Sequence, residues 1–94
     1  MNRKAKGCRN EHRSMAILEA AGYRCTRSAA SLGAWDIIGI GCEDTVLVQV
    51  KTRDWPCAAE MNCLRQFRVP PNTRKLVHRW RDHARSPDVK IVAE

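Results

Sequence analysis

Residues 35–51 read WDIIGIGCEDTVLVQVK, which is two apolar segments joined by a short turn that contains glycine. Segments of Ile, Val, Leu and Trp on either side of such a turn predict a β-hairpin. If the GCED turn closes the hairpin, Ile40 pairs with Thr45. Counting back along both strands then places Asp36 opposite Gln49, so their side chains share one face of the sheet.

Lys51 adds a third polar group to this face, because side chains two residues apart in a strand point the same way. A carboxylate within an apolar strand is costly unless a cation or an ammonium group compensates it. Asp36, the side-chain oxygen of Gln49 and several waters suit Mg²⁺, and Lys51 beside them would assist an attacking water or stabilise charge on a phosphate. A plain Asp36–Lys51 salt bridge is the simpler alternative. A β-bulge at Gly39 would shift the register by one residue.

The segment before the hairpin predicts a helix over residues 10–21, with Asn10 as N-cap and Gly22 after the last turn. Residues 1–9 would form a flexible basic arm. Glu11 lies on the apolar stripe of this helix, at the edge that faces the sheet, and would bring a second carboxylate towards Asp36 through water. A favourable interaction with the helix dipole is the alternative role for Glu11.

The remaining segments complete one small α/β domain over residues 1–94. They predict a second helix and three further strands, at residues 57–67, 23–27, 75–80 and 89–93. The expected order of elements is therefore αβββαββ, with a mixed sheet flanked by helices.

The net charge of +7 is distributed unevenly along the chain. Basic residues cluster in residues 3–13 and 65–85, whereas residues 28–50 contain no Lys or Arg. A basic frame around an acidic centre suits a polyanion whose backbone is brought to a metal ion. A generic basic surface is the alternative interpretation.

Composition narrows the class of protein further. A hydrophobic content of 44% is too high for a disordered chain, and no apolar segment approaches the about 20 residues of a membrane span. The five cysteines form no CxxC pair, which argues against the common zinc modules. No secretion signal is recognisable. We therefore expect a cytoplasmic, nucleoid-associated protein with reduced thiols, of a size compatible with a phage origin.

The ordered set of polar residues resembles the PD-(D/E)XK nuclease signature in a degenerate form. Asp36 is followed after twelve residues by Gln49-Val50-Lys51, on two adjacent hydrophobic strands. A helix that carries Glu11, followed by an Arg-Ser-rich loop at residues 27–33, is similar to the archaeal-type Holliday-junction resolvases. The small viral replication-repair (VRR-NUC-like) nucleases resemble it as well. The likeness covers Glu11 to about Lys51.

This resemblance implies a restriction-endonuclease-like core and a Mg²⁺-dependent DNA endonuclease, with Mn²⁺ as a substitute metal. It implies Asp36, Gln49 and Glu11 as metal ligands, Lys51 as the catalytic lysine and Ser31 near the scissile phosphate. It also implies a homodimer that acts on DNA, branched DNA in particular. We expect DNA contacts from Arg27, Ser28, Arg53, Trp55, Arg9 and Arg13.

Gln49 departs from the resemblance, because the family usually has Glu or Asp at this position. The lost charge weakens metal binding, so a catalytically degenerate PD-(D/E)XK-fold DNA-binding protein is the main alternative. A small basic protein that binds a protein partner through its tryptophans is a third interpretation. Trp35 and Trp80 are expected in the core or at a dimer interface, Trp55 against nucleic acid, and His78 at the surface.

Overall fold

The computed structural model describes residues 3–28 and 33–93, with the side chains of α1 described from Gly7 onwards. Its elements follow in the expected order αβββαββ. They are α1 (Arg3–Ala20), β1 (Arg24–Arg27), β2 (Ile37–Ile40), β3 (Thr45–Thr52), α2 (Ala58–Gln66), β4 (Thr73–Trp80) and β5 (Asp88–Ile91).

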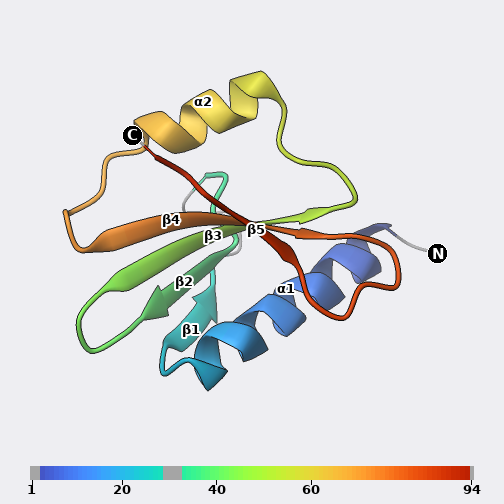
Figure 1. Cartoon of the computed structure of the whole chain (residues 1–94), viewed down its shortest axis with the longest axis horizontal. Coiled ribbons are helices and arrows are strands. Elements are labelled where there is room, and N and C mark those ends of the chain that lie inside the picture. Colours follow the sequence, from blue (N-terminus) through green and yellow to red (C-terminus); the bar gives the residue numbers. More distant parts are fainter. Residues whose placement is uncertain (1–2, 29–32, 94) are drawn as a thin grey trace.

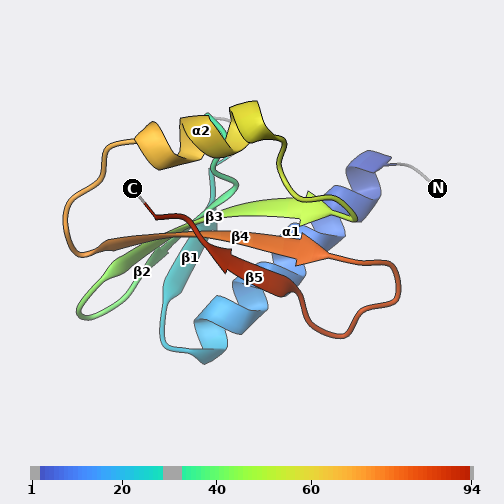
Figure 2. The ribbon, with the colours of Figure 1, turned by 45° about the horizontal axis from the view of Figure 1, so that its top comes forward.

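The described strands form one five-stranded sheet in the order β1-β2-β3-β4-β5. All neighbouring strands are antiparallel except β3 and β4, which are parallel and are connected through α2. The sheet is therefore mixed, as expected. Helices α1 and α2 lie on opposite faces of it (Figures 1 and 2).

The central hairpin has the register that the sequence predicts. Ile40 pairs with Thr45, and the ladder continues to Ile37 opposite Val48 without a bulge at Gly39. A Cβ atom at Gly39 would lie 2.8 Å from Cγ2 of Val46, so the glycine permits close approach of the neighbouring side chain.

Alternating residues of the hairpin pack into two separate core layers. Ile37, Val46 and Val48 pack with Leu18 of α1, whereas Leu47 packs with Met61 and Leu64 of α2 and with Trp35. Strand side chains point alternately to the two faces, and here both faces are covered. This explains why β3 is almost continuously apolar.

Helix α1 begins at Arg3 instead of residue 10, so the prediction of a flexible arm is wrong for residues 3–9. Lys, Arg and Ala are strong helix formers, and they extend the helix through this basic segment. Asn10 is consequently not an N-cap. Its side chain is 4% exposed and donates from Nδ2 to Oγ1 of Thr52, which holds α1 against the end of β3.

A buried polar network joins α1 to β4. The Ser14 hydroxyl, fully buried, accepts a hydrogen bond from Trp80 Nε1 at 2.8 Å and lies 2.9 Å from His78 Nδ1. The expectation that His78 lies at the surface is wrong, because its strand position faces α1 and leaves it 2% exposed. Burial lowers the pKa of His78. Trp80 is in the core, as expected.

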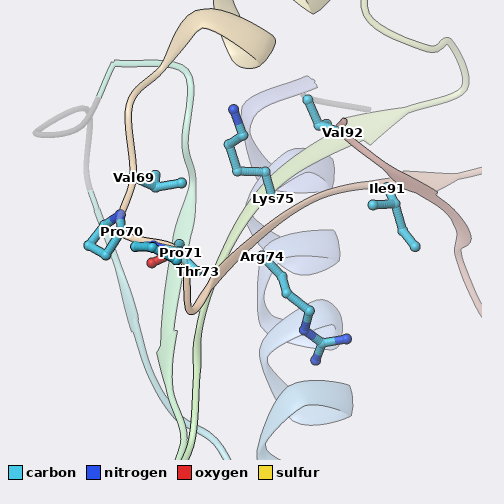
Figure 3. Close-up of a pocket in the computed structure, with 8 residues that line it drawn as sticks. All are labelled: Val69, Pro70, Pro71, Thr73, Arg74, Lys75, Ile91 and Val92. Atoms are coloured by element: carbon cyan, nitrogen blue, oxygen red, sulfur yellow. The ribbon is translucent and has the colours of Figure 1, made fainter. Parts of the chain in front are cut away.

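Lys75 closes the carboxyl end of α2. Its Nζ donates to the carbonyl oxygens of Leu64, Arg65 and Phe67 at 2.8, 2.9 and 3.1 Å, and the residue is 3% exposed. Helix ends leave carbonyl groups without intrahelical partners, and a lysine can satisfy them. Figure 3 shows Lys75 and the neighbouring Arg74 pointing in opposite directions, beside a cavity of about 390 Å³.

Two expectations about the class of protein can be compared with the described part of the chain. No helix in it is long and apolar enough to cross a membrane. All five cysteines are unpaired.

Candidate functional site

Asp36 lies directly before β2 and is bound to β3 on both sides of Gln49. Its backbone N–H donates to the carbonyl oxygen of Val48 at 2.9 Å, and its Oδ2 accepts the backbone N–H of Val50 at 2.7 Å. The carboxylate thus takes the place of a backbone acceptor at the end of the ladder. This arrangement fixes its position beside Gln49, as the hairpin register predicts.

The environment of Asp36 disfavours its charged form. Burial raises its pKa, and the negative charge of Glu11 acts in the same direction. The Val50 N–H, Lys51 and Arg27 lower the pKa but do not compensate for burial. A nearby cation stabilises the charged form of a carboxyl group in such a setting, and carboxyl groups with shifted pKa values are common at functional sites.

Gln49 carries an unsatisfied oxygen. The residue is 6% exposed, and its Oε1 is buried without a hydrogen-bond partner among the described residues. An unpaired buried acceptor costs about 1–3 kcal/mol. A cation or a polar hydrogen of a ligand would remove this cost. The side-chain oxygen is thus available where the sequence predicts a metal ligand.

Lys51 lies on the same strand two residues beyond Gln49 and is about one-third exposed. Its Nζ is 3.6 Å from Oε2 of Glu60 in α2, so the described ion pair is with Glu60 and not with Asp36. The other oxygen of Glu60 accepts the backbone N–H of Cys57 at 3.2 Å. Hydrogen bonding to Cys57 lowers the pKa of Glu60, and Lys51 lowers it further.

Sequence reasoning missed Glu60 as a neighbour of the lysine. Its position, three residues after Cys57 at the start of α2, matches a capping pattern that would have indicated its orientation.

Glu11 approaches the site from α1 and is held by Arg27 at the end of β1. Nε and one terminal nitrogen of Arg27 both lie 2.8 Å from Oε1 of Glu11. The hydrogen bond to Glu11 raises the pKa of Arg27. Because α1 begins at Arg3, Glu11 lies in the helix interior, and the first-turn dipole explanation for it does not apply.

The loop before β2 is only partly described. Ser28 is 7% exposed and its hydroxyl donates to the carbonyl oxygen of Trp35, so in the structure it supports the loop. Ser31 lies outside the described residues.

Trp55 is half-buried against the core layer that contains Trp35. The guanidinium carbon of Arg79 and Nζ of Lys90 lie 4.5 and 4.6 Å from its ring centroid. Two cationic groups thus lie over the Trp55 ring, which was expected to contact nucleic acid. A base that stacks on this ring would have to displace them.

The remaining predicted DNA contacts, Arg9, Arg13 and Arg53, lie together beside a cleft beyond the end of β3. Two groups of predicted residues therefore lie apart from Trp55. Glu11, Arg27 and Lys51 lie near enough to Asp36 to shift its pKa, whereas Arg9, Arg13 and Arg53 line this cleft.

The donor set around Asp36 fits a hard divalent ion that keeps most of its waters. Within residues 3–28 and 33–93, no group of three or more His, Cys, Asp or Glu side chains is arranged to hold a metal. Mg²⁺ often binds through one or two carboxylates and several waters. Asp36 and Oε1 of Gln49, which has no hydrogen-bond partner among the described residues, satisfy this requirement, with Glu11 close enough to influence the Asp36 pKa.

A mixed five-stranded sheet with a helix on each face is consistent with the restriction-endonuclease-like fold class. The solved structure of Hjc, a Holliday junction resolvase from the archaeal hyperthermophile Archaeoglobus fulgidus, is similar to this chain with a TM-score of 0.73 and 24% sequence identity. The match covers 93% of this chain and 73% of that chain. The resemblance predicted from the sequence is thereby confirmed for the fold.

Neither the protein-family models nor the curated proteins contain a match to this chain.

Proposed function

We propose that the protein is a Mg²⁺-dependent endonuclease that hydrolyses DNA phosphodiester bonds and acts selectively on branched DNA. Two observations carry this proposal. The Asp36 carboxylate is held by the backbone N–H of Val50, next to Gln49 in sequence, and Oε1 of Gln49 is buried without a hydrogen-bond partner among the described residues. Asp36 and Gln49 lie on a fold shared with a Holliday junction resolvase. The net charge of +7 supports DNA as the partner.

Asp36 and Gln49 would hold the ion, with Glu11 as a further acid reached through water. The ion, Mg²⁺ or Mn²⁺ in its place, would supply Lewis-acid stabilisation of the phosphate and activation of a water nucleophile. Lys51 would orient that water and stabilise negative charge on the phosphate. Arg27, which is 39% exposed at its side chain, would contact the DNA backbone.

A non-catalytic DNA-binding protein is the second candidate, and two observations favour it. Gln49 contributes no charge, and Glu11 is already paired with Arg27 at 2.8 Å. A protein of this kind would bind DNA in a salt-dependent manner without requiring a metal.

Cleavage assays distinguish the two candidates. Purified protein is incubated with a four-way junction and with linear duplex of the same sequence, in Mg²⁺, Mn²⁺ or EDTA. We expect cleavage with either metal, faster on the junction, and loss of cleavage in Asp36→Asn and Lys51→Ala. DNA binding without cleavage under both metals would establish the non-catalytic alternative. Undiminished cleavage by the two variants would refute the site.

A homodimer is part of the proposal, because cutting both strands of a branched duplex requires two sites. Light scattering coupled to size-exclusion chromatography measures the mass directly. A particle of twice the 10.7 kDa chain mass is expected, and a monomer at the protein concentration that cleaves junctions would contradict this part of the proposal.

A further inference from the structure

The cleft lined by the second group of arginines has a volume of about 450 Å³. It lies beyond the carboxyl ends of the parallel strands β3 and β4, where Thr52 pairs with Trp80. Its walls come from α1, from the residue after β3 and from the loop between β4 and β5, and Figures 1 and 2 both show these segments on the same side of the molecule. Ligands commonly bind at the carboxyl ends of parallel strands.

The lining of the cleft is polar and strongly positive. Four arginines and one aspartate give it a formal charge of +3 when His83 is neutral. They are Arg9, Arg13, Arg53, Arg81 and Asp82. The cavity in Figure 3 is lined mainly by Val69, Pro70, Pro71, Ile91 and Val92, and Arg74 and Lys75 give it a smaller formal charge of +2. The ligand of the basic cleft is therefore expected to be an anion.

Arg13 is held rigidly at the wall of this cleft. Its guanidinium carbon lies 3.9 Å from the ring centroid of Trp80, and one terminal nitrogen donates to the carbonyl oxygen of Ala84 at 2.6 Å. A guanidinium group has five N–H donors in a fixed plane, so the other donors of Arg13 are also fixed in direction. Such pre-organisation reduces the entropy lost when an anion binds.

Two residues of the cleft have an uncommon backbone conformation. Arg53 and His83 have φ angles of 72° and 62°, and they are the non-glycine residues with positive φ within the described chain. Arg53 is also tied to the β4–β5 loop, since its Nε lies 3.1 Å from Oδ2 of Asp82 and its backbone N–H donates to the Trp80 carbonyl oxygen. Uncommon backbone conformations of this kind cluster at ligand-binding sites.

We infer that this cleft binds a phosphate group of a nucleic-acid strand, separate from the phosphate that is cut at Asp36. Lys51 and Arg53 are two residues apart, about 7 Å along an extended chain. Phosphates follow one another every 3.4 Å along the axis for each strand of duplex DNA. A phosphate in the cleft would thus belong to a nucleotide close to the scissile one. This assignment of a flanking contact rests on the proposed function, whereas the anion site itself does not.

Fluorescence anisotropy of labelled duplex DNA, titrated with protein in EDTA at several salt concentrations, measures the contact without cleavage. The test variants are Arg53→Gly, which removes the guanidinium and suits the positive φ, and Arg81→Gln. Arg68→Gln is the matched control, because it removes the same charge from an exposed position that does not line the cleft. Arg65→Gln is a second control of the same kind, because Arg65 is exposed and does not line the cleft.

We expect each test variant to weaken DNA binding about tenfold and to lower the salt slope by about 1, and each control to change affinity less than twofold. Equal losses in Arg53→Gly and Arg68→Gln would overturn the inference, because the charge would then act only through the overall field. Titration with inorganic phosphate tests the other source of this anion. If phosphate alone binds wild-type protein at the cleft while DNA affinity is unchanged in Arg53→Gly, the nucleic-acid assignment is overturned.

The outcome is independent of catalysis. If Arg53→Gly binds DNA more weakly but the wild-type protein never cleaves DNA, the proposed phosphate site in the cleft is supported and the proposed endonuclease activity is refuted. If both test variants bind DNA normally and the wild-type protein cleaves DNA, the proposed phosphate site in the cleft is refuted and the proposed endonuclease activity stands.

Discussion

The carboxylate of Asp36 accepts the backbone N–H of Val50 at 2.7 Å, one residue before Lys51. An asparagine at position 36 retains an oxygen for this hydrogen bond, whereas an alanine does not. We therefore expect Asp36→Asn to keep the fold and to lose metal-dependent cleavage by at least about 100-fold. Asp36→Ala should lose cleavage equally and also about 1–3 kcal/mol of stability, because the Val50 N–H is left unpaired.

Urea unfolding in EDTA measures the stability of both variants, and junction cleavage in Mg²⁺ measures their activity. Equal stability of Asp36→Asn and Asp36→Ala would mean that the hydrogen bond to Val50 contributes nothing to the hairpin.

The raised pKa of Asp36 predicts a pH dependence of stability. A carboxyl group with a folded-state pKa above its unfolded value of about 3.9 binds its proton more tightly in the folded state. Wild-type protein should therefore become more stable relative to Asp36→Asn as the pH falls from neutrality through the folded pKa of Asp36. Urea unfolding of both proteins across this range in EDTA measures the difference. A difference that shrinks or stays constant would contradict the raised pKa.

Gln49→Glu should increase metal affinity and cleavage, because it supplies the charge that the site lacks. Without metal, the new carboxylate lies beside Asp36 in a buried position, so we expect lower stability in EDTA than for wild type. Added Mg²⁺ should raise the melting temperature of Gln49→Glu more than that of wild type. Gln49→Met is the control. It removes the unpaired oxygen, should gain about 1 kcal/mol of stability and should not respond to Mg²⁺.

Calorimetric titration with Mg²⁺ and thermal melts with and without the ion provide the comparison. An identical response of wild type, Gln49→Glu and Gln49→Met to Mg²⁺ would exclude position 49 from the metal site.

Lys75→Met keeps the aliphatic length of the side chain and removes its charge from the end of α2. Three carbonyl groups lose the Nζ donor, and we expect a loss of about 2–4 kcal/mol in the free energy of unfolding. Arg74→Gln next to it is the control. Arg74 is paired with Asp44 at an exposed position, with 2.9 Å between Nε and Oδ2, and its loss should cost no more than about 1 kcal/mol. Chemical denaturation of both variants measures the loss in the free energy of unfolding. Equal losses in Lys75→Met and Arg74→Gln would mean that Lys75 does not cap α2.

The buried His78 predicts a loss of stability in weak acid. Burial lowers its pKa, so the unfolded chain, with a His pKa of about 6.5, takes up a proton more readily than the folded protein. Stability should fall as the pH falls through about 6.5 and should continue to fall until the folded pKa is reached. A His78→Asn variant should lack the part of the slope that belongs to this residue, as urea unfolding between neutral and weakly acidic pH would show.

The sequence was sufficient to predict the order of elements and the register of the central hairpin, because alternation of side chains and a short turn are local signals. The sequence was not sufficient to predict that α1 begins at Arg3. Basic residues without an apolar stripe indicated an arm, and the contact that anchors the helix, from Asn10 to Thr52, joins residues 42 positions apart. His78 was placed wrongly for the same reason, since its partner Ser14 is 64 positions away.

At the candidate site, the position of Asp36 beside Gln49 followed from register, but the pairing of the flanking groups did not. Lys51 lies near Glu60, and Glu11 is bound to Arg27. Both pairs depend on how α1 and α2 are docked on the sheet, which short patterns do not encode.

Oε1 of Glu11 is already bound by Arg27, so a metal ion and the guanidinium would compete for the same oxygen. A divalent ion that recruits Glu11 must compete with the guanidinium, and the exchange is inexpensive because partly exposed ion pairs contribute little to stability. A phosphate that draws Arg27 away would release Glu11 for the ion. Under the proposed function, nucleic acid and metal would then enter the site cooperatively, and an ion alone would occupy it poorly.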